Sequence, residues 1–415
     1  MIKVRYSPLS GSVDAIPSKS YAHRVLFLAS LSDKPTVIKG KTTGVDTDAT
    51  IGVLKTLGAD IRETEDGYIV SPIRKTNENV LLNVCESGST LRFLLPLLSV
   101  LGVNATVIGE GRLAERPNEE LIRALTEAGA TFDGLTLPIK TSGKISKTVV
   151  SVRADISSQY VSGLLMSMQT LDTPCEIRLE GELKSKNYVD ITLDCMRSFG
   201  AEVEKTKNGF RLSGGGYRSP LNYTVEGDWS NSAFWLVVGA IGGKITVNNL
   251  NIHSYQGDKA IIDILKKANA KINVENNSVT VEKSSILPFT CDMEDTPDLV
   301  PVTAVLSSHA NGKCVLTNIE RLRFKESDRI QSTINLLNSV GINAYSEFNK
   351  MIIENGLHHG GTIDGVNDHR IVMSACIMGS VISDGVTVTD EHAVDKSYKN
   401  FYRDFKELGG IIENA

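Results

Sequence analysis

A short segment centred on glycine recurs six times along this chain of 415 residues. The first copy, LKTLGADI around Gly58, joins an apolar helical face to a glycine and then to an extended run. Further copies follow at intervals of 71, 71, 69, 72 and 68 residues, around Gly129, Gly200, Asn269, Gly341 and Gly409. Glycine and asparagine adopt positive φ most easily, so each copy predicts a helix closed by a left-handed residue and followed by a strand. The chain is therefore predicted to be a sixfold repeat of a small α/β unit.

A second periodic feature lies out of phase with the first. Small or acidic polar residues precede strongly apolar segments at intervals of 70, 69, 71, 70 and 70 residues, beginning at Ser18, Gly88, Ser157, Asp228, Asp298 and Asp368. Serine, aspartate and glycine satisfy the free N–H groups at a helix start, and an apolar residue on every face indicates a buried helix. Each repeat should thus supply one buried helix and one more exposed helix that ends at the glycine or asparagine.

Repeat symmetry implies that the buried helices of one domain run the same way. Their N-termini then collect at one end, where the helix dipoles attract anions. The polar side chains at these starts are Lys19, Ser20, Arg24, Arg92, Ser157, Ser158, Gln159, Asp228, Asp298, His369 and Arg370. A single arginine near a helix start is usually solvated, but recurrence across the repeats favours a shared anion site. Charged loops at 112–117 and 321–329, taken alone, read as surface loops with salt bridges, and Lys396 alone reads as an exposed lysine.

Length and composition narrow the class of protein. A chain of 415 residues exceeds one hydrophobic core, which favours two domains of three repeats each. The apolar runs, such as Phe93–Val100, are too short to span a bilayer, and a net charge of −5 disfavours nucleic acid or an anionic membrane as partner. The six cysteines lack metal-ligand spacing, and the first residues lack the apolar core of a signal peptide. We therefore expect a cytoplasmic protein with reduced thiols.

Ten motifs in order along the chain resemble those of the 5-enolpyruvylshikimate-3-phosphate synthase family. They are Pro17-Ser-Lys-Ser with Arg24, Gly88 with Arg92, Glu115-Arg116-Pro117, Ser157-Ser158-Gln159, Ser185–Asp190, Glu226-Gly227-Asp228, Pro297-Asp298, Lys325-Glu326-Ser327-Asp328-Arg329, Asn367-Asp368-His369-Arg370 and Lys396. The resemblance runs over essentially the whole chain. It implies an α/β fold, a two-lobed inside-out barrel of six βαβαββ repeats, three per lobe about pseudo-threefold axes. One lobe would hold residues 1–16 and 227–415, and the other residues 17–226.

The resemblance also implies an activity. The enolpyruvyl group of phosphoenolpyruvate would be transferred to the 5-hydroxyl of shikimate 3-phosphate, a step of aromatic amino acid biosynthesis, with release of phosphate. No metal or organic cofactor would be needed, the protein would be a monomer, and the lobes would close to exclude water. Two phosphates and two carboxylates must be held together, which requires many cations.

Residue roles follow from motif positions. The resemblance implies that shikimate 3-phosphate is bound by Lys19, Ser20, Arg24, Ser157, Ser158, Gln159, Ser185, Asp298 and Lys325. It implies that phosphoenolpyruvate is bound by Lys19, Gly88, Arg116, Gln159, Arg329, Arg370 and Lys396. Asp298 would be the base at the 5-hydroxyl, while Glu326 and Lys19 are the candidates for protonating the methylene carbon. Glu86 is unexpected so close to an anion site.

Two alternatives remain open at this point. The sister enzyme that transfers enolpyruvyl to UDP-N-acetylglucosamine shares fold and donor, but it usually carries a cysteine in the loop that here reads Gly109–Arg116 without one. A non-catalytic repeat scaffold would explain the periodicity, though not cations that converge at helix starts.

Overall fold

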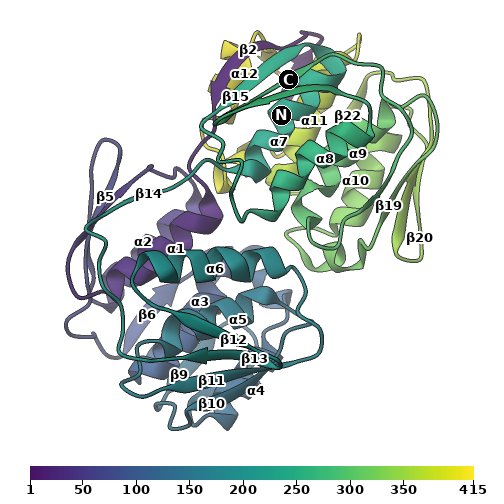
Figure 1. The fold of residues 1–415 in the computed structure, drawn as a ribbon. Helices are drawn as coiled ribbons and strands as arrows, with labels where there is room; N and C mark the ends of the chain where they lie inside the picture. The colour runs from purple at the N-terminus through teal and green to yellow at the C-terminus, as the bar shows by residue number, and fades with distance from the viewer. The chain divides into compact units, whose positions relative to one another are not determined.

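The computed structural model describes all 415 residues, which form two compact units. Unit 1 comprises Met1–Ile16 and Glu226–Ala415, and unit 2 comprises Pro17–Val225 (Figure 1). The structure is mixed α/β, with six sheets of four strands each. None of its helices combines the length and the apolar content that crossing a membrane requires.

One repeat of unit 2 gives the pattern of the whole chain. Its elements are β6 (Val80–Asn83), α3 (Gly88–Leu101), β7 (Ala105–Ile108), α4 (Glu119–Glu127), β8 (Thr131–Asp133) and β9 (Ile139–Ser142). The sheet order is β6-β7-β9-β8, in which only β6 and β7 are parallel. A parallel pair needs a crossover connection, here α3, whereas the last two strands form a hairpin. Each repeat therefore reads βαβαββ.

The other complete repeats follow the same order. Unit 2 contains β10 (Val149–Arg153), α5 (Ser158–Met168), β11 (Cys175–Glu180), α6 (Lys186–Ser198), β12 (Val203–Thr206) and β13 (Gly209–Leu212). Unit 1 contains β18 (Thr290–Asp292), α9 (Val300–Ser308), β19 (Cys314–Thr317), α10 (Arg329–Asn338), β20 (Ala344–Glu347) and β21 (Lys350–Ile353). Their sheets have the orders β10-β11-β13-β12 and β18-β19-β21-β20.

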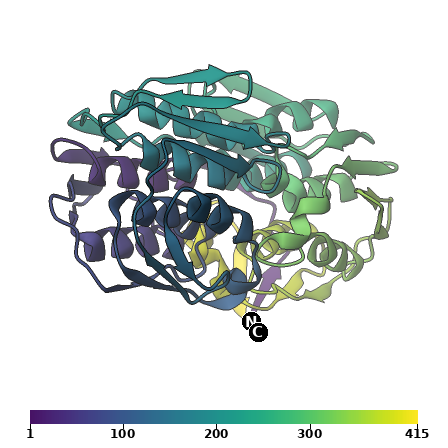
Figure 2. The same cartoon turned by 90° about the horizontal axis from the view of Figure 1, so that it is seen from below.

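Three sheets are completed by strands that lie outside their own repeat. The remaining elements of unit 2 are α1 (Lys19–Ser30), β3 (Thr36–Lys39), α2 (Val45–Leu57), β4 (Asp60–Glu63), β5 (Gly67–Ser71) and β14 (Asn222–Thr224). Those of unit 1 are β1 (Ile2–Arg5), β2 (Ser10–Asp14), α7 (Trp229–Gly242), β15 (Lys244–Asn248), α8 (Ile261–Lys267), β16 (Lys271–Glu275), β17 (Ser278–Glu282), β22 (Gly361–Ile363), α11 (His369–Val381), β23 (Val386–Val388), α12 (Phe401–Glu407) and β24 (Ile411–Asn414). Strand β14 pairs with β3, β2 pairs with β15, and β1 lies between β23 and β24. The last pairing brings the two chain ends together (Figure 2).

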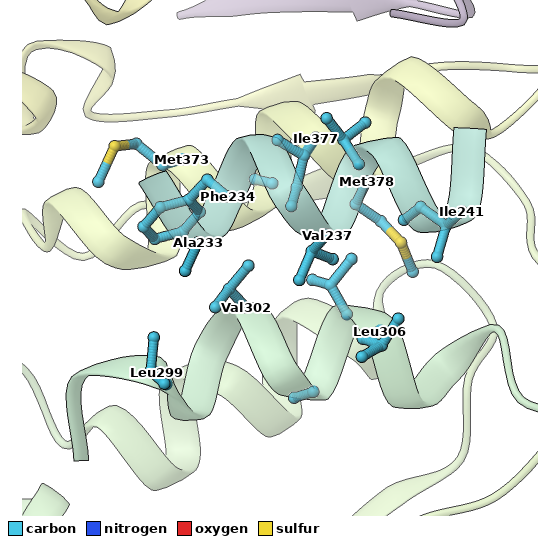
Figure 3. Close-up of a cluster of buried hydrophobic side chains, with 14 of the residues drawn as sticks. Ala233, Phe234, Val237, Ile241, Leu299, Val302, Leu306, Met373, Ile377 and Met378 are labelled. Atoms are coloured by element: carbon cyan, nitrogen blue, oxygen red, sulfur yellow. The ribbon is translucent and has the colours of Figure 1, made fainter. Parts of the chain in front are cut away.

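The predicted apolar helices are buried, three in each unit. They are α1, α3 and α5 in unit 2 and α7, α9 and α11 in unit 1. In unit 1, Leu299, Val302 and Leu306 face Ala233 and Val237 of α7 (Figure 3). Residue numbers increase in the same direction along α7, α9 and α11 in that view, so these three helices run parallel. Their N-termini consequently gather at one end of the unit.

The predicted left-handed helix stops are confirmed at all six positions. The φ values are 117° at Gly58, 116° at Gly129, 74° at Gly200, 64° at Asn269, 87° at Gly341 and 99° at Gly409. At Gly58 a Cβ atom would also lie 2.5 Å from the carbonyl oxygen of Lys75. Both conformation and space therefore require glycine there.

The predicted helix starts are confirmed with two adjustments. Ser18, Ser157, Asp228 and Asp368 are N-cap residues, but Gly88 is the first helical residue and Ser87 caps it. Asp298 lies inside a 3-10 turn, η3 (Pro297–Leu299), that precedes α9. Proline favours a first helical turn because it lacks an N–H group, and Pro297 begins this turn.

Candidate active site

The helix starts of unit 1 carry aspartate. The Asp228 carboxylate accepts a hydrogen bond from the backbone N–H of Asn231 at 2.7 Å, and Asp368 accepts one from the N–H of Arg370 at 3.0 Å. Asp298 occupies the corresponding position before α9. An acidic residue at a helix start satisfies free N–H groups and interacts favourably with the helix dipole.

Arg329 is the fully buried centre of an ion-pair network in this region. Its Nε atom lies 2.9 Å from Oδ2 of Asp368, and its Nη1 atom lies 2.8 Å from Oδ1 of Asp298. Its Nη2 atom also donates to Glu326. The charges of Asp368, Glu326 and Asp298 together outweigh the burial of the guanidinium and raise the pKa of Arg329 above its usual value. Arg329 therefore fixes three carboxylates relative to one another.

Asp298 faces three cations. Besides Arg329, its Oδ1 atom lies 3.4 Å from Nζ of Lys325, and its Oδ2 atom lies 3.3 Å from Nη2 of Arg370. Nearby positive charges favour the ionised carboxylate. The side chain of Asp298 remains 17% exposed, whereas Arg329 is 0% exposed. The Asp298 carboxylate is therefore surrounded by positive charge and remains partly exposed.

Lys396 lies beside the loop that leads into α11. Its Nζ atom donates to the carbonyl oxygen of Asn367 at 2.7 Å, and Asp390 accepts from the N–H of Asn367 at 2.9 Å. Val366 and Asn367 both have positive φ, 43° and 52°, which is costly for a β-branched residue such as valine. The two charged side chains hold this strained loop in place.

The helix starts of unit 2 carry serine. Ser18, Ser87 and Ser157 are the N-cap residues of α1, α3 and α5. The Ser157 hydroxyl accepts from the N–H of Gln159 at 3.3 Å, and Ser158 is the first residue of α5. Since a serine cap carries no charge, no carboxylate at these caps neutralises the positive end of the helix dipole.

Two basic residues of α1 are held by neighbouring elements of unit 2. Nζ of Lys19 lies 2.8 Å from Oδ2 of Asp46, at the start of α2. Arg24 is buried, with its Nε atom 2.7 Å from the Thr192 hydroxyl and Nη2 2.9 Å from the carbonyl oxygen of Tyr188, both in α6. Its Nη1 atom donates to the backbone carbonyl oxygen of Ser20. Burial lowers the pKa of Arg24 to about 10, which leaves it charged at neutral pH.

Gln159 links α3 and α5. Its Oε1 atom accepts from Arg92 at 2.6 Å, and its Nε2 atom donates to the hydroxyl of Ser89 at 2.8 Å. Arg92 also donates to Asn118 and to the carbonyl oxygen of Pro117. The orientation of the Gln159 amide is thus fixed by two side chains of α3.

Gly88 and Arg116 are in direct contact. A Cβ atom at residue 88 would lie 2.6 Å from Nη1 of Arg116 and 2.9 Å from its central carbon. The guanidinium forms no ion pair within the chain, and its buried Nε atom has no hydrogen-bond partner. Ser185, at the N-cap of α6, has a positive φ of 48° and is buried. Glu86 lies against Gly111.

The sequence matches known proteins over its full length. The family model described as EPSP synthase (3-phosphoshikimate 1-carboxyvinyltransferase) matches residues 4–405. The 3-phosphoshikimate 1-carboxyvinyltransferase of Clostridium novyi (strain NT) is 35% identical over 426 residues, with 99% of this chain and 98% of the relative covered. The protein of that name from Clostridium kluyveri is 36% identical over 427 residues, with the same coverage.

This chain belongs to the EPSP synthase family.

Solved structures agree on the fold. An EPSP synthase from Acinetobacter baumannii superimposes with a TM-score of 0.85 at 24% identity, covering 100% of this chain and 99% of that one. The enolpyruvyl transferase NikO from Streptomyces tendae gives a TM-score of 0.81 at 16% identity, covering 100% and 98%. The expected α/β fold of this family is thus confirmed.

Within this EPSP synthase family member, the site residues expected from sequence are divided between the two units. Two further residues were missed, namely Asp46, which pairs with Lys19, and Asp258, which lies close enough to Asp298 and Arg370 for their charges to affect its ionisation. Both aspartates follow the second strand of their repeat, Asp46 as the second residue of α2 and Asp258 in a 3-10 turn, and this shared position is the signal that the sequence offers. Aspartate is so common in loops that this position alone did not stand out.

Proposed function

We propose that this chain transfers the enolpyruvyl group of phosphoenolpyruvate to the 5-hydroxyl of shikimate 3-phosphate and releases phosphate. Membership of the EPSP synthase family supports this acceptor. The observation that carries the proposal is the partly exposed Asp298 carboxylate, held by Lys325, Arg329 and Arg370 at the helix starts of unit 1. That arrangement combines a base with cations for anionic substrates.

The proposed donor site binds the phosphate and carboxylate of phosphoenolpyruvate. Its residues are Lys19, Gly88, Arg116 and Gln159 of unit 2 and Arg329, Arg370 and Lys396 of unit 1. Arg116 supports this assignment most directly, because its guanidinium has no carboxylate partner and packs on a residue without a side chain. An arginine fork matches phosphate and carboxylate geometry, and its charge needs an anion when it is desolvated.

The proposed acceptor site binds shikimate 3-phosphate. Its residues are Lys19, Ser20, Arg24, Ser157, Ser158, Gln159 and Ser185 of unit 2, with Asp298 and Lys325 of unit 1. The serine hydroxyls and N–H groups at the start of α5 suit a phosphate group. The hydrogen bonds of Arg24 to α6 give it a second role, which is to fix α1 beside the helix that Ser185 caps.

The proposed chemistry is an addition followed by an elimination. Asp298 takes the proton of the 5-hydroxyl, whose oxygen then attacks the substituted carbon of the phosphoenolpyruvate double bond, while a proton is added to its methylene carbon. Loss of a proton from the resulting methyl group and departure of phosphate restore the double bond. Lys19, an ammonium paired with Asp46, has a proton to give, whereas Glu326, paired with Arg329, must first gain one.

The proton donor can be identified by isotope incorporation. In deuterated water, the methyl group of the intermediate acquires deuterium at a rate set by the donor. We expect Lys19→Met or Glu326→Gln to slow that incorporation, and an unchanged rate in both variants would exclude both residues.

The activity itself is tested by phosphate release from phosphoenolpyruvate with two acceptors. We expect release with shikimate 3-phosphate and none with UDP-N-acetylglucosamine. Release only with the UDP-sugar would contradict the proposed acceptor and leave the donor assignment standing. Every assigned residue lies in one chain, so the proposal needs only a monomer, which sedimentation analysis during turnover would check.

A further inference from the structure

Two polar contacts, one helical turn apart, join α1 to α2. In the first contact Nζ of Lys19 lies 2.8 Å from Oδ2 of Asp46, and both side chains are partly exposed. In the second contact Nδ1 of His23 lies 2.7 Å from the Thr50 hydroxyl, and both residues are buried. His23 lies four residues after Lys19 in α1, and its partner lies four residues after Asp46 in α2. Residues at this spacing share one face of a helix, so the buried contact supports the exposed one.

The buried contact continues to the start of α3. The Thr50 hydroxyl lies 2.7 Å from the Thr90 hydroxyl, and Thr90 donates to the hydroxyl of Ser87 at 2.7 Å. Ser87 caps α3 and directly precedes Gly88. The three hydroxyl-bearing residues are all 0% exposed. A buried network of four side chains, from His23 through Thr50 and Thr90 to Ser87, thus joins α1 to the cap of α3.

Thr50 is the residue that connects the two ends of this network. The Nε2 atom of His23 is buried without a hydrogen-bond partner, so the contact of Nδ1 with Thr50 is the one hydrogen bond of the ring. Thr90 keeps other contacts, with Ser87 and with the carbonyl oxygen of Asp46 at 3.4 Å. A buried polar group that loses its partner costs free energy. Loss of the Thr50 hydroxyl would therefore release α1 and leave the start of α3 in place.

We propose that Thr50 is a positioning residue for the proposed donor site, because its hydroxyl fixes Lys19 of α1 relative to Gly88 at the start of α3. The inference rests on the proposed function, which assigns both of these residues to phosphoenolpyruvate. Arg116 packs on Gly88, so the network also governs how the two cations of unit 2 are placed for one small anion. Binding groups need such support from hydrogen bonds outside the site, because a small displacement weakens their hold on the ligand. The start of α5, proposed to hold the acceptor phosphate, lies outside this network.

The test compares the KM values of the two substrates in Thr50→Val, which replaces the hydroxyl by a methyl group. We expect the KM for phosphoenolpyruvate to rise about tenfold and that for shikimate 3-phosphate to change by less than about twofold. A general loss of stability would not separate the two substrates in this way. Equal changes in the two KM values, or no change in either, would overturn the proposal.

Two further variants control for the substitution itself. Thr50→Ser keeps the hydroxyl and should keep the KM for phosphoenolpyruvate within about twofold of the wild-type value. Thr56→Val makes the same change elsewhere on α2, where the exposed hydroxyl donates to the carbonyl oxygen of Gly52, and it should follow the wild type. A serine variant that behaves like Thr50→Val would contradict a role for the hydroxyl.

Thr90 offers a second place to interrupt the network. Thr90→Val should raise the KM for phosphoenolpyruvate as Thr50→Val does, whereas Thr90→Ser should not. The double variant Thr50→Val/Thr90→Val should show no larger rise than one of the single variants, because both interrupt the same connection. If circular dichroism shows that Thr50→Val does not fold, the two Thr90 variants decide the question, and equal KM values in them would overturn the inference.

The outcomes also separate this inference from the proposed function. A wild-type protein that releases no phosphate from phosphoenolpyruvate would overturn both. A working enzyme whose KM for phosphoenolpyruvate is unaffected by Thr50→Val would overturn this inference alone.

Discussion

Each unit contains three buried helices, but the residues at the helix N-termini differ between the units. In unit 2 the three buried helices are capped by Ser18, Ser87 and Ser157, whereas in unit 1 Asp228 and Asp368 cap two helices and Asp298 precedes the third. Serine and aspartate are equally good caps, so stability alone does not explain the division. The difference is one of charge.

This difference in charge gives the two units different roles in the proposed site. In unit 1 the cations are paired with acids, as Arg329 is with three carboxylates, so this unit combines anion binding with a base. In unit 2 Arg116 has no acidic partner and the caps are neutral, so this unit is suited to holding anions. The proposed base thus lies in unit 1, whereas the arginine without an acidic partner lies in unit 2.

The largest expected effect concerns the acid of unit 1 that has no cap role. Asp298→Asn removes the proposed base, and we expect the turnover number to fall by a factor of about 10² to 10⁴. Asp295→Asn, three residues earlier and exposed, is the control and should leave turnover unchanged. Turnover near the wild-type value in Asp298→Asn would show that Asp298 is not the base.

Arginine substitutions should separate the two units. Arg329→Met leaves buried carboxylates without a counter-charge and should destabilise unit 1 by about 3–5 kcal/mol. Arg116→Met breaks no ion pair, so it should cost less than about 1 kcal/mol and act instead by raising the KM for phosphoenolpyruvate. The two tryptophans, Trp229 and Trp235, both lie in α7, so tryptophan fluorescence during urea unfolding reports on unit 1, while far-ultraviolet circular dichroism follows both units. Equal stability losses would contradict the comparison.

A buried histidine should make unit 2 sensitive to acid. Burial, reinforced by the charges of Lys19 and Arg24 and opposed by Asp46, lowers the pKa of His23 to about 3. Between pH 6.5 and pH 3 the unfolded chain binds a proton that the folded chain does not, so stability falls as the pH falls, by about 1.4 kcal/mol per pH unit.

The variant His23→Gln should keep the hydrogen bond to Thr50 and lose this dependence. Urea unfolding at pH 6.5 and pH 5 would measure it by far-ultraviolet circular dichroism, with tryptophan fluorescence marking the transition of unit 1. We expect the wild type to lose about 2 kcal/mol more than the variant over that interval. Identical losses would show that His23 titrates normally in the folded chain.

The smallest expected effect comes from a serine cap. Ser87 accepts hydrogen bonds from the N–H and the hydroxyl of Thr90, and Ser87→Ala should destabilise unit 2 by about 1 kcal/mol. Ser198→Ala removes an exposed hydroxyl within α6 and serves as control. If α3 shows no loss of protection from hydrogen exchange in Ser87→Ala, the cap contributes nothing to unit 2.

Much of this fold could be predicted because its signals are local. A left-handed stop such as Gly58 needs only a residue without a Cβ atom, and a buried helix needs only apolar side chains on every face. The pairing of β14 with β3 could not be predicted, because the two strands are far apart in sequence. The residues of a short strand do not specify which strand it pairs with. The order of the motifs indicated which residues belong to the candidate site, but not which of them are paired.

The sequence by itself determined the sixfold period, the caps, the stops and the family. The tertiary structure decided which charges meet, as when Arg24 bonds to Thr192 of another repeat and Arg329 collects Asp298 and Asp368. It also brought Asp258 to the start of α7, where the Ser230 hydroxyl donates a hydrogen bond to it. The physical reason is that helix and turn preferences depend on a few neighbouring residues, whereas the energy of a buried charge depends on every group that folding brings near it.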